Sequence, residues 1–84
     1  MLMATYPEIK LKALLAKVFK VPVEQISSDA SPDTIETWDS LRHMDLVLAL
    51  EEEFGVELTD DQVIEVLTYQ LIKLVLGEHN ALFE

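Results

Sequence analysis

The chain contains no cysteine, so it can form neither a disulfide bond nor a thiolate metal site. This absence suits a reducing compartment, and we expect a cytoplasmic protein. Glycine is scarce, with two residues among 84, and the sequence holds no internal repeat and no low-complexity stretch. Because 50% of the residues are hydrophobic, the composition favours a folded chain over a disordered one.

Long hydrophobic runs are also absent. No apolar stretch approaches the roughly 20 residues needed to span a bilayer, and residues 1–10 lack the basic and then apolar pattern of a signal peptide. We therefore expect no membrane insertion. The length fits one domain, residues 1–84, with a modest core and no room for a deep active-site cleft.

Basic residues are few: 6 lysines and arginines stand against 16 acids, for a net charge of −10. Four of the bases lie within the first twenty residues, whereas residues 24–65 hold thirteen acids and a single base, Arg42. Such a surface repels nucleic acid and anionic membranes and attracts basic protein partners. Composition alone also allows a plainer explanation, in which the acidity only aids solubility.

Apolar residues at helical spacing predict a first helix over about residues 6–20. Thr5 and Glu8 have the spacing of a capping box at its start, and Pro22 ends it. The turn-rich segment 21–38 follows; it is either a long functional loop or a plain crossover between helices that are not antiparallel neighbours. Its expected contacts with the core are Val21, Val23, Ile26, Ile35 and Trp38.

A second helix is predicted over about residues 39–54, stopped by Gly55. A short third helix over about 59–66 opens with Thr59 and Gln62, which again have capping-box spacing. The fourth helix is expected over about 68–79, with Thr68 as its cap. No strand pattern competes, so we predict an all-α four-helix bundle with a long first loop and a short third helix. In the tail, Leu82 and Phe83 either pack back onto the bundle or fray.

The second helix has two apolar faces when its residues are placed at about 100° per step. The first is the predicted core face, with His43 beside it: Leu46, Val47, Leu50 and Phe54. The second lies roughly opposite and joins apolar residues to acids: Leu41, Met44 and Leu48 with Asp45, Glu51 and Glu52. An outer apolar strip edged by acids is typical of a docking surface. The alternative is that Leu41 or Met44 packs under the long loop, and we expect this for part of the strip.

Ser40 opens this helix, three residues before His43, and the pair with nearby Asp45 suggests a hydrolase triad. Asp45, however, points away from His43 on the same helix, and no glycine-rich turn is present for an oxyanion hole. A half-buried histidine that contacts the loop is the preferred interpretation of His43. A calcium loop beginning at Asp29 fails as well, because Thr34 stands where the sharp turn needs glycine and Ser40 where a bidentate glutamate belongs. Only weak divalent binding by the acidic surface stays open.

The three residues Asp-Ser-Leu at 39–41 are a weak signal alone, since Asp39 and Ser40 suit a helix start. In context the signal is specific. A long loop, Asp-Ser-Leu opening an amphipathic helix, then LEEEFGVEL and TDDQV, resembles the acyl carrier protein family. The resemblance runs from the first helix through Leu76 and is strongest over WDSLRHMDLVLALEEEFGVEL, residues 38–58.

The resemblance implies a non-catalytic carrier. In the family this serine, here Ser40, receives a 4′-phosphopantetheine arm from coenzyme A through a phosphopantetheinyl transferase, and the arm's thiol holds acyl groups as thioesters. A serine at a helix N-terminus suits this role, because the helix end favours the negative charge of a phosphodiester.

The resemblance also implies that the second helix docks on basic patches of acyl-loading and synthase-type enzymes. The matching residues are Asp39, Leu41, Met44, Asp45, Leu48, Glu51, Glu52, Glu57 and Asp60. In the family the bundle interior can shelter the attached chain. The matching residues, which core packing explains equally well, are Val47, Leu50, Phe54, Val63, Val66 and Ile72. We expect a monomer.

Two residues depart from the pattern common in housekeeping fatty-acid carriers: Trp38, where a small residue is usual, and Arg42, where an acid is usual. They favour a specialised carrier, or one related to peptidyl and aminoacyl carriers, and leave the cargo open among fatty acyl, polyketide, hydroxyacyl and aminoacyl groups. The methionine just before the first helix leads us to expect a discrete carrier. The alternative from another class is an unmodified acidic helical adaptor that binds basic partners through the second helix.

Overall fold

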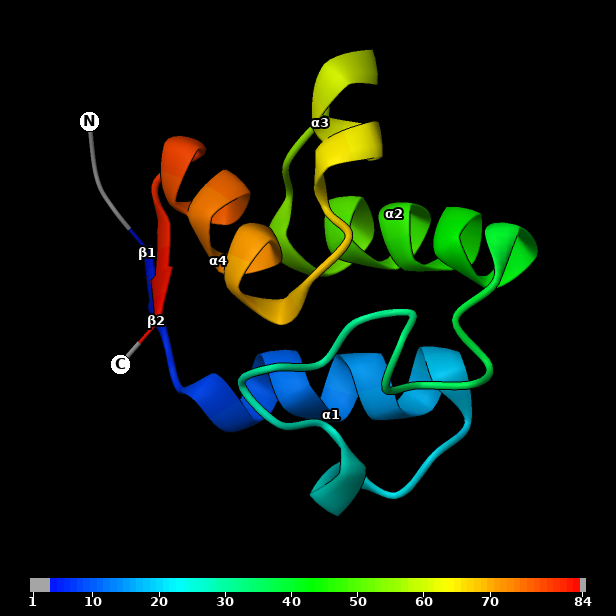
Figure 1. The fold of residues 1–84 in the computed structure, drawn as a ribbon. Helices are drawn as coiled ribbons and strands as arrows, with labels where there is room; N and C mark the ends of the chain where they lie inside the picture. Colours follow the sequence, from blue (N-terminus) through cyan, green and yellow to red (C-terminus); the bar gives the residue numbers. More distant parts are fainter. Residues whose placement is uncertain (1–3, 84) are drawn as a thin grey trace.

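The computed structural model describes residues 4–83. Four helices dominate it, and Figure 1 shows α2 above α1, α3 standing upright at the top and α4 on the left. The elements in chain order are β1 (Ala4–Tyr6), α1 (Glu8–Phe19), a 3₁₀ turn (Val23–Gln25), α2 (Ser40–Phe54), α3 (Asp60–Glu65), α4 (Tyr69–Glu78) and β2 (Ala81–Phe83). The predicted all-α bundle with a long first loop and a short third helix is confirmed, apart from one small sheet. Among the described residues, no helix is long and apolar enough to cross a membrane.

The helix ends follow the capping chemistry expected for three of the four helices. Thr59 and Gln62 form a reciprocal capping box, and the Thr68 hydroxyl accepts a hydrogen bond from the Leu71 N–H. Gly55 ends α2 in the left-handed region, at φ 63°, where a side chain would be strained. These local signals explain why the predicted bounds lie within two residues of the observed ones.

The predicted capping box of α1 is wrong. Thr5 lies in strand β1, and the N-cap of α1 is Pro7, which makes no side-chain hydrogen bond. Glu8 instead forms an ion pair with Lys73 of α4, and this partner lowers the pKa of the Glu8 carboxyl. Thr5 and Glu8 therefore have the spacing of a capping box but do not form one. Thr5 pairs in the sheet, and the Glu8 carboxylate pairs with Lys73 instead.

The two strands form a parallel pair with Thr5 opposite Leu82 and Tyr6 opposite Phe83. The prediction that no strand is present is wrong, and the tail packs back instead of fraying. Tyr6 and Phe83 of the sheet form an aromatic cluster with Phe54 of α2, with ring centroids 5.0 Å apart for Tyr6 and Phe54 and 5.4 Å apart for Phe54 and Phe83. Figure 1 shows the sheet at the left edge of the molecule, beside α4.

The long loop is anchored to the core. Ile26, Ile35 and Trp38 are buried as predicted, whereas Val21 and Val23 are only half-buried. The alternative of a crossover between helices that are not neighbours is wrong, because α1 and α2 contact each other and run in opposite directions (Figure 1). The loop instead reaches α4, where the Tyr69 N–H donates to the Ala30 carbonyl at 2.9 Å, and then returns to the start of α2.

Candidate functional site

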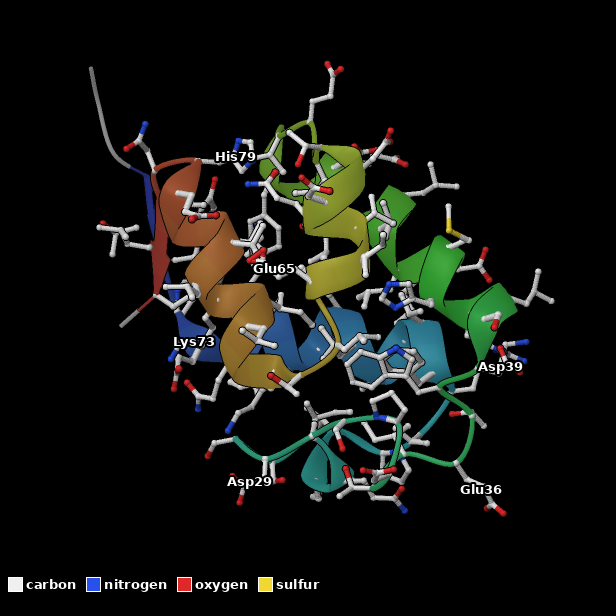
Figure 2. The ribbon with its side chains drawn as sticks, turned by 45° about the horizontal axis from the view of Figure 1, so that its top comes forward. Asp29, Glu36, Asp39, Glu65, Lys73 and His79 are labelled. Carbon is white, nitrogen blue, oxygen red and sulfur yellow. The ribbon has the colours of Figure 1, made fainter. Side chains whose placement is uncertain are left out.

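Ser40 is the first residue of α2 and is exposed. Its neighbour Asp39 is the N-cap, and the Asp39 carboxylate accepts a hydrogen bond from the Arg42 N–H at 2.8 Å. Figure 2 shows Asp39 at the free end of α2, on the side of the view away from Lys73 and the strands. Because Asp39 performs the capping, the Ser40 hydroxyl is not needed to start the helix.

The residues around Ser40 are tied to the end of α1. The Arg42 guanidinium donates to the Val18 carbonyl at 3.3 Å, and the Thr37 hydroxyl donates to the Phe19 carbonyl at 2.6 Å. Carbonyls in the last turn of a helix have no partner within the helix, so both contacts satisfy groups that otherwise need water. They hold the start of α2 against α1 on both sides of Ser40.

Trp38 lies two residues before Ser40 and is buried. Its indole ring stacks on Phe19 with centroids 4.6 Å apart, and its Nε1–H donates to Nδ1 of His43 at 3.1 Å. Nε2 of His43 lies 2.8 Å from the carbonyl oxygen of Val63 at the end of this chain of contacts. Since a carbonyl can only accept, these partners assign a neutral His43 with its proton on Nε2. The imidazole of His43, three residues after Ser40, thus links α2 to the long loop through Trp38 and to α3 through Val63.

These contacts argue against a hydrolase. Both nitrogens of His43 are engaged by Trp38 and Val63, so neither is directed at the Ser40 hydroxyl as a general base. The expectation of a half-buried histidine that contacts the loop is confirmed. Among residues 4–83, no group of three or more histidine, aspartate or glutamate side chains is placed to hold a metal ion.

An apolar hollow of ≈ 490 Å³ opens beside Ser40. Its walls come from the long loop, from α2 and from the segment that joins α3 to α4: Pro32, Trp38, Asp39, Ser40, His43, Met44 and Leu67. Pro32 and Leu67 were not predicted as site residues, and both lie outside the helices. The sequence gives a signal only for Leu67, a large apolar residue in the three-residue segment 66–68 between α3 and α4.

The outer face of α2 is exposed as the helical wheel predicted. Leu41, Met44 and Leu48 have exposed fractions of 74%, 49% and 60%. The alternative that Leu41 or Met44 packs under the loop is therefore wrong. Asp45 and Glu52 are also exposed, so acids edge the apolar strip.

Glu51 differs from its two acidic neighbours. Its side chain is half-buried, and its carboxylate accepts a hydrogen bond from the Leu58 N–H at 2.9 Å. This contact fixes the connector between α2 and α3, which carries exposed Glu57, and Asp60 follows at the start of α3. The structural role of Glu51 could not be predicted from the sequence, because a helical wheel does not distinguish its carboxylate from that of Glu52.

A second hollow, of ≈ 460 Å³, lies between α1 and α2. Lys17 and Lys20 line it from the end of α1, and Asp45 and Glu52 line it from α2, together with Leu41. The docking face predicted from α2 alone is thus bordered by bases of α1, a feature that depends on how the two helices pack.

Most residues expected to line an acyl cavity belong to the core. Val47, Leu50, Val66 and Ile72 are buried and Val63 is half-buried. Phe54 lies at the opposite end of α2 from Ser40, in the aromatic cluster with Tyr6 and Phe83.

The fold is a short four-helix bundle that presents an exposed serine at the N-terminus of α2. Residues 10–72, which include Ser40, match the protein family described as "Phosphopantetheine attachment site". The chain is 35% identical over 63 residues to the acyl carrier protein of Buchnera aphidicola, covering 75% of this chain and 80% of that protein. It is 39% identical over 61 residues to the acyl carrier protein of Thermosynechococcus vestitus, covering 73% and 75%. The chain belongs to the acyl carrier protein family, and its cofactor is covalently bound 4′-phosphopantetheine.

The start of α2 fits this cofactor. Ser40 is exposed, and the first N–H groups of a helix have no intrahelical acceptor, so they favour a phosphodiester.

Proposed function

We propose that Ser40 is the attachment residue and that the chain delivers acyl intermediates to biosynthetic enzymes. The observation that carries this proposal is an exposed serine at the first position of a helix whose capping is done by Asp39. In the attachment step the Ser40 oxygen bonds to the pantetheine-bearing phosphorus of coenzyme A. The diphosphate bond breaks, adenosine 3′,5′-bisphosphate leaves, and the serine proton passes to a base of the phosphopantetheinyl transferase. When bound, the arm supplies a thiol that holds acyl groups as thioesters.

The partners we propose are that transferase and acyl-loading or synthase-type enzymes with basic docking patches. The exposed apolar strip of α2 would give affinity, and the acids would give orientation. The proposed docking residues are Asp39, Leu41, Met44, Asp45, Leu48, Glu51, Glu52, Glu57 and Asp60. Glu51 would act mainly by holding the connector, because its carboxylate is already engaged.

The pathway is proposed only by class: fatty acid or polyketide synthesis, or a related specialised route, in the cytoplasm and as a monomer. Support for a specialised route comes from Trp38 and Arg42. Both make specific contacts that a small residue and an acid could not make, with His43 and with the Val18 carbonyl.

Intact mass measurement tests the attachment. The protein is incubated with coenzyme A and a broad-specificity phosphopantetheinyl transferase, beside Ser40→Ala and the control Ser28→Ala, which changes an exposed serine of the loop. We expect one phosphopantetheine adduct on the wild type and on Ser28→Ala, and none on Ser40→Ala. An adduct that persists in Ser40→Ala contradicts the assignment of the site.

An acidic helical adaptor is the second candidate, because the exposed strip of α2 could bind a basic partner without any modification. No adduct on folded wild-type protein, with helical content verified by circular dichroism, would favour the adaptor.

A further inference from the structure

We propose that the apolar hollow beside Ser40, named here the Trp38 hollow, holds a compact, uncharged acyl group at the surface of the protein. The hollow is lined by Ser40 itself together with Trp38, His43, Met44 and Leu67. This inference rests on the proposed function, since the occupant is the group carried by the arm on Ser40.

The contacts of His43 favour a surface location over an interior one. Its ring bridges α2 to the Val63 carbonyl of α3 and accepts the Trp38 indole N–H, so a chain entering between these helices from Ser40 would break both contacts. Behind this bridge, Leu50, Val66 and Ile72 have exposed fractions of 0%. An interior site would therefore require lost hydrogen bonds and displaced core side chains, whereas the Trp38 hollow is already open.

Because the acyl group is attached to the protein through the arm on Ser40, a weakly binding hollow is enough to hold it. A group attached through a short flexible arm has an effective concentration in the millimolar range, so an affinity of about 1 mM keeps about half of it bound. The hollow's volume of ≈ 490 Å³ lies within the range of small-ligand sites. Because Ser40 lines the hollow, the arm has only to fold back on itself.

The lining selects the chemical class of the group. Trp38 and His43 both line the hollow, and their rings lie nearly parallel, at 18° with centroids 6.3 Å apart, which suits an aromatic or branched acyl group. The flexible thioether of Met44 can adapt to its shape. Asp39 is one of the lining residues, so its carboxylate would repel an acyl group that ends in a carboxylate.

The test uses forms of the protein loaded from coenzyme A, benzoyl-coenzyme A, dodecanoyl-coenzyme A and succinyl-coenzyme A, each verified by intact mass. Trp38 is the sole tryptophan, so its emission reports the hollow directly. The second readout is the chemical shift of the Met44 methyl group, and the third is the rate at which hydroxylamine cleaves the thioester. The variant is Leu67→Ala, and the matched control is Leu74→Ala, an exposed leucine on α4 outside the hollow.

We expect the benzoyl group to change Trp38 emission and the Met44 shift relative to the unacylated arm, and to be cleaved about twofold more slowly than from Leu67→Ala. Leu74→Ala should behave as the wild type, and the succinyl form should show neither change. The inference is overturned if Trp38 and Met44 do not respond, if the response survives Leu67→Ala, or if the benzoyl or dodecanoyl group shifts the Val66 and Ile72 methyls more than that of Met44. Failure to form any adduct would instead contradict the proposed attachment at Ser40.

Discussion

Trp38 and Arg42 stand next to the attachment serine and hold the helix that presents it. Arg42 reaches the Val18 carbonyl of α1, and Trp38 stacks on Phe19 while its N–H reaches His43. Arg42 thus ties the start of α2 to α1, and Trp38 ties the loop before Ser40 to α1 and to α2. Trp38 and Arg42, the two residues that depart from the common pattern, therefore have structural roles. Any effect they have on partner choice would come from how they position Ser40.

Asp39 combines a structural task with a proposed docking charge, and two substitutions separate them. Asp39→Ala removes the oxygen that accepts the Arg42 N–H and should lower the free energy of unfolding by about 1 kcal/mol. Asp39→Asn retains a capping oxygen and should change it by only a few tenths of a kcal/mol. Urea denaturation measures both. Equal destabilisation by the two variants would show that the charge of Asp39, and not its capping bond, supports the helix.

Tyr69 links stability to alkaline pH. Burial, and then the charge of Glu8, raise the pKa of Tyr69 from 10.0 to about 12. The folded state therefore holds this proton more tightly than the unfolded chain, so stability should fall as the pH rises from 10 to 12. Tyr69→Phe has no proton to lose.

The comparison of wild type and Tyr69→Phe isolates this hydroxyl from Lys12 and Lys73, whose ammonium groups lie 5.7 Å from the centroid of the Tyr69 ring and are present in both proteins. Thermal midpoints measured from pH 9 to 12 should fall more steeply for the wild type. Parallel curves would show that the hydroxyl does not contribute.

At the scale of elements, the acids of α2 are of two kinds: exposed side chains, and a side chain that is hydrogen-bonded within the protein. Glu52→Lys should leave the fold intact and raise the KM for the phosphopantetheinyl transferase, because Glu52 is exposed on the proposed docking face. Glu51→Lys removes the acceptor of the Leu58 N–H and should cost about 1–3 kcal/mol of stability. Urea denaturation and transferase kinetics on both variants check this. The division is wrong if Glu51→Lys is as stable as Glu52→Lys.

The small sheet joins the two ends of the described chain. Phe83 of β2 packs against Tyr6 and Phe54, so Phe83→Ala should lower the free energy of unfolding by about 1–3 kcal/mol. Leu82→Ala changes the adjacent, exposed residue of the same strand and should cost less than about 0.5 kcal/mol. Attachment at Ser40, at the other end of α2, should continue in both. Similar losses from the two variants would show that pairing of the backbone, and not the aromatic cluster, stabilises this edge.

The helices could be predicted because their information is local. Caps such as Thr59 with Gln62, and the period of Leu46, Val47, Leu50 and Phe54, lie within one helix length. The sheet could not, because strands of three residues show no clear alternation and their partners lie at opposite ends of the sequence.

The candidate site also combines features that are local in the sequence with features that depend on distant segments. The exposed start of α2 and its outer face were predictable from one helix, and the resemblance identified Ser40 as the attachment candidate. The Trp38 hollow was not predictable, since Leu67 comes from the segment between α3 and α4 and the His43 bridge ends on a backbone carbonyl, which no residue type indicates.

At the scale of the whole molecule, packing places bases beside acids. The sequence carries a net charge of −10, yet the hollow between α1 and α2 is lined by Lys17 and Lys20 as well as by Asp45 and Glu52. A partner that docks there meets an acidic helix with a basic border. The partner surface that complements this face best is therefore a basic patch with an acid at its edge, opposite the lysines of α1. Such a pattern of charges would fix the orientation of docking.

This arrangement predicts a dependence on salt. Raising the ionic strength from about 0.01 M to 0.15 M shortens the Debye length from about 30 Å to 8 Å. The KM of the phosphopantetheinyl transferase for the wild type should therefore rise, with little change in kcat, because screening weakens the encounter of an acidic carrier with a basic enzyme. Asp45→Lys together with Glu52→Lys should raise the KM at low salt and flatten its dependence on salt. Lys17→Glu, at the basic border, should steepen this dependence if the partner patch is purely basic and should leave it unchanged or flatten it if an acid faces Lys17. A KM that does not respond to salt in the wild type would contradict electrostatic docking through this face.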